Sequence, residues 1–242
     1  MKIININADL GEGTGNDKAL MPMLASCSVA CGGHYGDENT MRTALRLAKK
    51  YNVKVGAHPS FPDLENFGRE KLTLTKDELR STVYEQIMRL AIICDEEDIP
   101  LHHVKPHGAL YNYAAIDAAT ADAIVEAILD TKLRPKLYIQ HDSILYHKAK
   151  NLLPVVPEAF IDRGYSPDLK LKSRSEEGAV ITSPEEAWEQ LIGFVENNKV
   201  STAAGDKAII AETFCLHSDH GNAVEILRYL KQKLTELNYR IG

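Results

Sequence analysis

Ionisable side chains recur in this sequence directly after short runs of apolar residues. The stretch VKPHGALYN, residues 104–112, is the most compact example, because Lys105 and His107 stand two residues apart at the end of such a run. Two groups that can both carry positive charge repel each other, so packing alone gives no reason for this pair. A negatively charged partner, such as a substrate carboxylate or a developing oxyanion, would give the pair a role.

The same pattern occurs after six other apolar runs. In order along the chain, all seven runs are followed by Asp9 and Glu12; His34 and Asp37; His58; Lys105 and His107; His141 and Asp142; Glu158, Asp162 and Arg163; and His217, Asp219 and His220. The carboxyl ends of parallel strands in an α/β fold lie on one side of the sheet. We therefore expect these side chains to converge on one mouth.

Seven apolar runs alternate with helical patterns, which is typical of a parallel α/β sheet, open or closed. Most runs are continuously apolar, as strands covered on both faces require. Thr75 and Glu78 form a capping box, and Ser183 followed by Pro184 marks another helix start. The predicted strands are 2–8, 28–31, 53–56, 101–104, 136–139, 155–160 and 208–216. The predicted helices are 38–51, 75–94, 118–130, 143–151, 221–237 and one that begins at 183.

No linker or repeat divides the chain, so we predict one domain over residues 1–242, with an irregular excursion at 161–183. The net charge is −6 without a block of like charges, which argues against nucleic acid or an anionic membrane as the partner. The four cysteines form no C-x-x-C pair and are interpreted as buried thiols. No segment has eighteen uninterrupted apolar residues, so we expect a cytoplasmic protein without a membrane span.

Each polar residue also has an ordinary structural interpretation. Asp37 and Asp219 precede predicted helices, where a carboxylate commonly serves as the N-cap. Arg163 has acids of its own strand end within reach as ion-pair partners. His34 or His58 taken alone is more often a hydrogen-bonded core histidine than a catalyst or ligand. A site is therefore indicated by the whole set of residues rather than by one member.

An ordered set of motifs over residues 3–230 resembles the LamB/YcsF family. The motifs are NADLGEG, ACGGHYGD, GAHPSFPD, FGRE, VKPHGALYN, EAFIDRGY and CLHSDH. The resemblance implies an irregular seven-stranded, TIM-like (β/α) barrel of the glycoside hydrolase/deacetylase superfamily. The chain departs from the usual family motifs at positions between the residues named above, which leaves the exact substrate open. These positions include Gly33, Tyr35, Asn66, Glu70 and Ser218.

Characterised members of this family are A subunits of bacterial ATP-dependent 5-oxoprolinase. The resemblance therefore implies ring opening of 5-oxo-L-proline to L-glutamate, with ATP and Mg²⁺ as co-substrate and with partner subunits B and C. No tightly bound cofactor is expected, and a homo-oligomer stays compatible with the sequence. The GEGTG stretch at 11–15 is neither a dinucleotide fingerprint nor a Walker A loop. The nucleotide chemistry is therefore expected to need the partner subunits.

The resemblance also implies a set of site residues. The expected catalytic residues are Asp9, Glu12, His34, His58, Lys105, His107 and Asp162. The expected substrate-binding residues are Asp37, Arg69, Tyr111, Asn112, Glu158, Arg163, His217 and Asp219. One acid or imidazole of the first set would act as general base on water, and the two arginines would offer a bidentate fork to a carboxylate or phosphate. The individual acid and base stay unassigned.

Two other functions stay open at this stage. A metal-dependent, deacetylase-like hydrolase would hold a divalent ion such as zinc with Asp9, His34 and His58. These three residues lie on different predicted strands, so their spacing gives no support. A non-catalytic lactam-binding subunit would need only a few polar groups, fewer than this chain offers.

Overall fold

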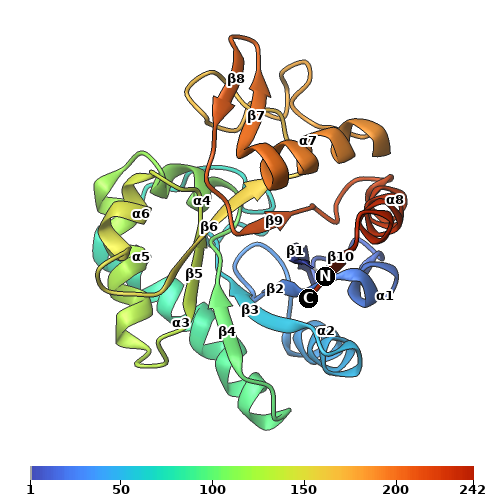
Figure 1. Cartoon of the computed structure of the whole chain (residues 1–242). Coiled ribbons are helices and arrows are strands. Elements are labelled where there is room, and N and C mark those ends of the chain that lie inside the picture. Colours follow the sequence, from blue (N-terminus) through green and yellow to red (C-terminus); the bar gives the residue numbers. More distant parts are fainter. Residues whose placement is uncertain (1) are drawn as a thin grey trace.

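Seven parallel strands close into a barrel in the computed structural model of the chain, which describes residues 2–242 (Figure 1). Strand β9 pairs in parallel with both β6 and β1, and this pairing closes the barrel. The barrel strands are β1 (Lys2–Leu10), β2 (Ser26–Ala30), β3 (Lys54–His58), β4 (Leu101–Val104), β5 (Lys136–Ile139), β6 (Val155–Phe160) and β9 (Thr213–Cys215). The irregular TIM-like barrel predicted from the sequence is confirmed. Residue 1 of the predicted domain lies outside the described residues.

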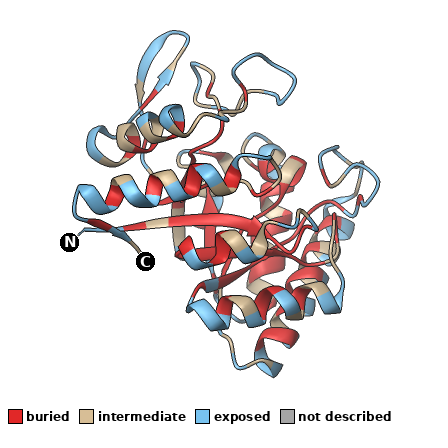
Figure 2. Ribbon diagram, turned by 90° about the vertical axis from the view of Figure 1, so that its right-hand side faces the viewer, coloured by how far each residue is buried: buried red, intermediate tan, exposed pale blue. Residues whose placement is uncertain are grey.

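Helices surround the barrel, and Figure 2 shows that their buried faces point toward the strands. Helix α3 begins with the predicted capping box of Thr75 and Glu78, and α7 begins after Ser183 with Pro184 in its first turn. The helices are α1 (Asp17–Leu20), α2 (Glu38–Tyr51), α3 (Lys76–Glu96), α4 (Gly108–Ala114), α5 (Ala118–Asp130), α6 (Ile144–Ala149), α7 (Pro184–Asn197) and α8 (Ala223–Glu236), with a 3₁₀ turn η1 (Met21–Met23).

The predicted strand at 208–216 is wrong in its extent. Residue 208 ends β8 (Gly205–Ala208), which pairs with β7 (Lys199–Thr202) in an exposed antiparallel hairpin. Only Thr213–Cys215 enters the barrel, because residues 209–212 form an irregular connection. Strand β10 (Tyr239–Ile241), which pairs with the start of β1, was not predicted. An apolar run does not by itself show where a strand ends and a connection begins.

Strand β1 explains how the barrel separates an apolar layer from a polar lumen. Ile4, Ile6, Ala8 and Leu10 are buried in the hydrophobic core outside the barrel. The alternate residues Asn5, Asn7 and Asp9 face inward, because successive side chains of a strand point to opposite faces. The lumen is therefore filled by hydrogen-bonding groups rather than by the branched apolar side chains common in such barrels.

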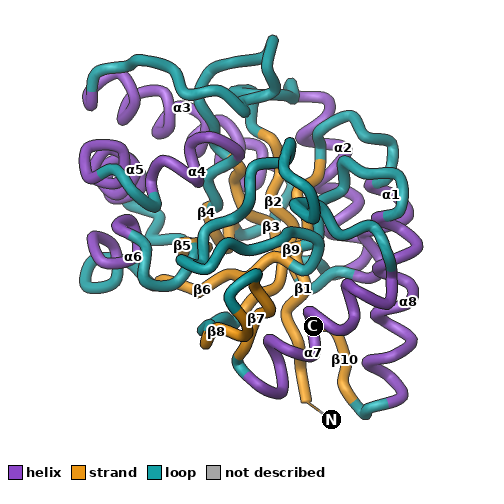
Figure 3. The backbone as a smooth tube through the Cα atoms, turned by 90° about the horizontal axis from the view of Figure 1, so that it is seen from above, coloured by secondary structure: helices purple, strands orange, loops and turns teal. Residues whose placement is uncertain are grey.

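Loops lie across the barrel strands in the view of Figure 3. The longest of them, residues 161–183 between β6 and α7, contains two isolated bridges and no helix or strand. Among residues 2–242, no helix is long and apolar enough to cross a membrane. All four cysteines are buried and unpaired, as predicted. Burial raises the pKa of Cys94 to about 12, which keeps this thiol protonated.

Candidate active site

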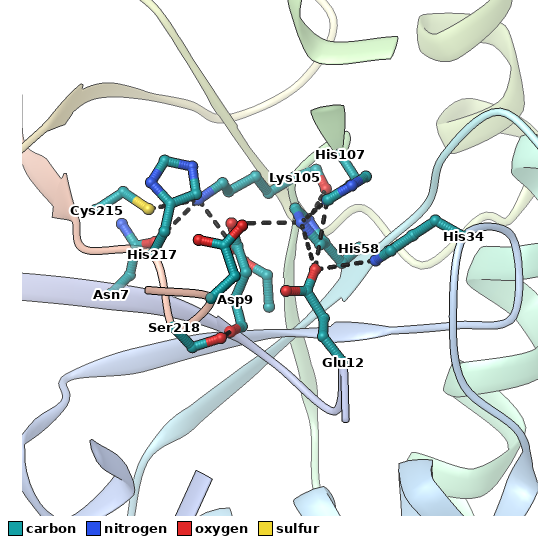
Figure 4. A network of polar contacts seen from close by, with 12 residues as sticks. Asn7, Asp9, Glu12, His34, His58, Lys105, His107, Cys215, His217 and Ser218 are labelled. Atoms are coloured by element: carbon teal, nitrogen blue, oxygen red, sulfur yellow. Dashed lines mark hydrogen bonds and ion pairs between the residues drawn. The ribbon is translucent and has the colours of Figure 1, made fainter. Parts of the chain in front are cut away.

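Side chains from three strand ends meet inside the mouth of the barrel (Figure 4). Asp9 is the penultimate residue of β1, His58 is the last residue of β3, and Lys105 directly follows β4. Glu12 and His107 stand in the loops just beyond these strands. All five are buried, although they come from distant parts of the sequence.

Lys105 is the buried cation at the centre of this group. Its Nζ lies 3.0 Å from Asp9 Oδ1 and 3.1 Å from Glu158 Oε1, and it donates to Asn7 Oδ1 at 3.2 Å. Burial acts to lower the pKa of Lys105, but Asp9, Cys215 and Glu158 outweigh it and raise that pKa well above its usual value. Lys105 is therefore a permanent ammonium held by carboxylates of the protein itself.

Asp9 is the matching anion. Burial acts to raise the pKa of Asp9, but His58 and Lys105 outweigh it and lower that pKa well below its usual value. Asp9 Oδ2 lies 3.4 Å from His58 Nε2. Asp9 and Lys105 thus form an ionised pair in which each group keeps the other charged.

The imidazoles form a second layer beside this pair. His107 Nδ1 lies 2.9 Å from His58 Nε2, and the His34 ring stacks on the His107 ring with 3.7 Å between centroids. Burial first, and then His34 and His58, lower the pKa of His107 well below 6.5. Lys105 contacts Asp9 and Glu158, while His107 contacts His58, and both residues line the cavity. That the two face one common substrate anion stays a prediction.

Glu12 joins the imidazole layer. Its Oε1 lies 2.9 Å from His34 Nε2 and 3.4 Å from His107 Nδ1. Burial and the charge of Asp9 raise the pKa of Glu12 well above its usual value. Burial and His58 lower the pKa of His34 well below 6.5. These shifts favour the neutral forms of Glu12, His34 and His107, in contrast to the ionised Asp9–Lys105 pair.

Asp162 holds His217 at another edge of the mouth. Its carboxylate accepts hydrogen bonds at 2.9 Å from the backbone N–H and from Nδ1 of His217, and it lies 3.3 Å from His220 Nε2. Burial acts to raise the pKa of Asp162, but His217 outweighs it and lowers that pKa. His217 lines the cavity and Asp162 does not, so Asp162 acts on the site by orienting His217.

A cavity of about 510 Å³ opens above these groups. Asp9, Glu12, His58, Lys105 and His107 form its floor, and Tyr111 and Asn112 belong to its wall. The rim carries Asp219, which pairs with Arg69 at 2.5 Å and with Arg174 at 2.9 Å. Lys170, Lys172 and Arg163 add further positive charge to the lining.

Several expected site residues lie elsewhere or have structural partners. Asp37 is exposed and forms the N-cap of α2, where its side chain accepts from the backbone N–H of Thr40. Arg163 lines the cavity, but its Nε donates to the carbonyl of Ala179 and so holds the 161–183 loop. Asp142 pairs with His147 in a surface turn, and the residue that lines the cavity from this strand end is Gln140.

Three basic residues of the 161–183 loop that line the cavity were not expected from the sequence. Lys170, Lys172 and Arg174 stand at alternate positions in the stretch DLKLKSR. That alternation of basic residues within an otherwise irregular segment was the available signal. It was overlooked because these three residues lie well beyond the end of β6 and so do not directly follow a strand.

Within residues 2–242, two groups of side chains bring enough donor atoms together to hold a metal ion. One consists of Glu12, His34, His58 and His107, and the other of Asp9, Cys215 and His217. The triad expected from the sequence, Asp9, His34 and His58, is not assembled as a group. Asp9 is instead engaged with Lys105.

The closed parallel barrel, with an acid, base and cation cluster at the carboxyl ends of its strands, has the architecture of a β/α-barrel enzyme. A family model described as the LamB/YcsF family matches residues 4–242. The chain belongs to the LamB/YcsF family.

Known proteins of similar sequence and structure support this assignment. The A subunit of 5-oxoprolinase from Symbiobacterium thermophilum is 40% identical over 246 residues, which cover 99% of this chain and 94% of that protein. The crystal structure of a lactam utilization protein from Thermus thermophilus matches with a TM-score of 0.92 and 38% identity, covering 100% of this chain and 99% of that one. A family 4 carbohydrate esterase from Streptomyces lividans shares the fold, with a TM-score of 0.52 and 12% identity over 100% of this chain and 92% of that one.

Proposed function

We propose that this chain is the A subunit of a cytoplasmic, ATP-dependent 5-oxoprolinase. The enzyme is a hydrolase that opens 5-oxo-L-proline to L-glutamate together with partner subunits B and C. Relatives of 37% to 40% identity are named as the A subunit of 5-oxoprolinase. The observation that supports the proposal most directly is the ionised Asp9–Lys105 pair on the floor of a cavity with a cationic rim.

The chemistry explains why ATP is needed. A lactam carbonyl is a poor electrophile, because the ring nitrogen donates electron density into it. Transfer of a phosphoryl group from ATP to the amide oxygen makes the carbon open to attack by water. The C–N bond then breaks, the nitrogen takes up a proton, and a second water releases phosphate to leave glutamate.

Asp9 is the general base in this proposal. It lines the cavity and its pKa is lowered, so it is ionised at neutral pH and can accept the proton of the attacking water. Lys105 fixes the orientation and charge of Asp9. His34 and Asp162, which were candidates in the sequence, do not line the cavity and are left as positioning residues.

The basic residues of the rim are suited to bind the anions of the reaction. Arg69 and Arg174 line the cavity from two different loops and suit the lactam carboxylate, since a guanidinium binds a carboxylate with two hydrogen bonds. Lys170 and Lys172 suit a phosphoryl group. We assign the binding of ATP, with Mg²⁺, to the assembled complex rather than to this chain alone.

The test is reconstitution of the complex from separately purified chains. This chain is mixed with the B and C subunits, 5-oxoproline, ATP and Mg²⁺, and each component is omitted in turn. Release of glutamate and phosphate only in the complete mixture is expected. Glutamate release without ATP, or none with every component present, would reject the proposal.

A non-catalytic role can be separated by calorimetry on the isolated chain. Two results together would identify a pure binding subunit. The Asp9→Asn variant would still bind 5-oxoproline tightly, and the complex containing this variant would release glutamate at an unchanged rate. The proposal instead expects this variant to lose turnover.

A further inference from the structure

The ring nitrogens of His58 and His107 have protonation states that their neighbours fix. His58 Nδ1 lies 2.7 Å from the carbonyl oxygen of Lys105, and His107 Nε2 lies 2.9 Å from the carbonyl oxygen of Phe67. A carbonyl oxygen only accepts hydrogen bonds, so both of these nitrogens carry a proton. In the neutral form of such a ring, the other nitrogen is an acceptor.

These two acceptor nitrogens face each other. His58 Nε2 and His107 Nδ1 are 2.9 Å apart in a buried layer of the mouth. Two lone pairs at this distance repel, so the arrangement requires positive charge between or beside them. A shared proton or a bound metal ion meets this requirement.

Glu12 favours the metal ion. Its Oε1 lies 3.4 Å from His107 Nδ1 and 3.8 Å from His58 Nε2. Tetrahedral coordination with bonds of about 2.0–2.1 Å places neighbouring ligand atoms about 3.3–3.4 Å apart. The three separations of 2.9, 3.4 and 3.8 Å lie on both sides of that value.

We infer that Glu12, His58 and His107 bind a divalent first-row transition-metal ion in the mouth of the barrel. Two imidazoles and one carboxylate suit zinc or an ion of similar preference. The carbonyls that hold the far nitrogens of both rings match the outer partners that metal-binding histidines normally have. This ligand set shares only His58 with the triad suggested by the sequence, and it does not depend on the identity of the substrate.

His34 supports the site from behind. Its side chain is fully buried and does not line the cavity, and its Nε2 lies 2.9 Å from Glu12 Oε1. Its other ring nitrogen has no hydrogen-bond partner among residues 2–242, so no outer carbonyl prepares it as a ligand in the way seen for His58. His34 is therefore a positioning residue for Glu12.

The open side of the ion faces the cavity. Glu12, His58 and His107 all line it, and Asp9 Oδ2 lies 3.4 Å from His58 Nε2. Three protein ligands with one open position are typical of catalytic rather than structural zinc sites. A divalent ion here would supply a Lewis acid beside the ionised Asp9.

The second group of donor atoms does not compete. Asp9, Cys215 and His217 surround a space that an ammonium already enters, because Lys105 Nζ lies 3.0 Å from both Asp9 Oδ1 and Cys215 Sγ. A divalent cation at that position would be repelled by Lys105. The inference is therefore confined to the imidazole layer.

Metal content tests the inference without any assay of activity. The full chain is produced in medium supplemented with Zn²⁺ or Co²⁺, purified without chelator, and examined by inductively coupled plasma mass spectrometry. The wild type should hold about one ion per chain, and Glu12→Gln and His107→Ala should lose affinity at least ~10-fold. His141→Ala, a histidine at another strand end that is outside the cluster, should retain the ion.

X-ray absorption of the Co²⁺-loaded wild type gives a second measurement that needs no variant. We expect a first shell of nitrogen and oxygen only, with the outer-shell signal of two imidazoles. Sulfur in the first shell would move the ion to Cys215 and overturn the inference. A visible spectrum that does not change when Co²⁺ is added would also overturn the inference, and it would assign a shared proton to the His58–His107 pair. Full metal retention in folded Glu12→Gln and His107→Ala would overturn the inference as well.

Discussion

The two ends of the barrel lumen are both polar and both buried, but they differ in charge. At the carboxyl end, Lys105 lies between Asp9 and Glu158. Toward the amino end, Tyr138 accepts from the Asn5 amide at 3.2 Å and stacks on the His103 ring with 4.0 Å between centroids. One end is built from ions and the other from neutral hydrogen-bonding groups.

The pKa directions show how burial produces this difference. Burial lowers the pKa of His103 well below 6.5 and raises the pKa of Tyr138, so both groups stay neutral. At the other end, opposing charges overcome burial for Asp9 and Lys105. Buried polarity alone therefore does not identify a site in this barrel. Buried ions next to a cavity identify the site.

The largest effect is expected from removing the cation of the charged end. Lys105→Met leaves Asp9 and Glu158 buried without their common partner. Breaking a buried pair in this way costs about 3–5 kcal/mol in the free energy of unfolding. Urea unfolding of the isolated chain measures this cost.

The matched control is a lysine in a surface ion pair. Lys148 lies 2.9 Å from Asp122 with 41% of its side chain exposed, so Lys148→Met should cost less than about 1 kcal/mol. Equal losses in the two variants would mean that the lumen pair is not desolvated in solution.

A smaller effect is expected from acid at the neutral end. Burial, followed by the charges of Lys136 and Lys54, lowers the pKa of His102 to about 4, and burial lowers the pKa of the adjacent His103. Below pH 6.5 the unfolded chain therefore binds protons that the folded chain does not. The contribution of these two histidines to the free energy of unfolding is fully present above this pH, and it is lost as the pH drops from 6.5 toward 4.

Urea unfolding at a series of pH values measures this loss. His102→Asn should make the dependence shallower between pH 6.5 and 4, because one of the two histidines no longer titrates on unfolding. If the free energy of unfolding of His102→Asn depends on pH as steeply as that of the wild type, groups other than His102 cause the loss of stability.

The smallest effect is expected from a single hydroxyl at the neutral end. Tyr138→Phe removes the oxygen that accepts from Asn5 at 3.2 Å and that lies 3.4 Å from Ser26 Oγ. The expected cost is about 0.5–1.5 kcal/mol, and turnover of the assembled complex should not change. A clear loss of turnover would give the neutral end a part in the reaction that the charge comparison denies.

Much of the fold could be predicted because barrel strands covered on both faces have continuous apolar sequences. The strands at 101–104, 136–139 and 155–160 have the predicted bounds. The last strand failed because Ile209 and Ile210 extend its apolar run into a connection. The β7–β8 hairpin and the short β10 were missed because neither has a buried apolar pattern.

The candidate site was predictable where a residue lies at the carboxyl end of a strand or directly after it. Asp9, His58 and Lys105 meet for this reason. Sequence spacing could not show that Lys105 turns into the lumen, and it left open whether Asp37 caps a helix, as it does, or lines the site. Sequence spacing also could not show that the 161–183 loop lies over the mouth, because this position is defined only by the closed barrel.

The most direct test of the account is turnover by Asp9→Asn in the reconstituted complex, with Tyr138→Phe as the reference. The amide keeps the shape of Asp9 but cannot accept a proton, and the loss of a general base lowers turnover about 10²–10⁴-fold. We predict a fall of this size in glutamate release, with unchanged turnover in Tyr138→Phe. Near-normal glutamate release by a folded Asp9→Asn variant would contradict the claim that the charged end of the lumen opens the ring.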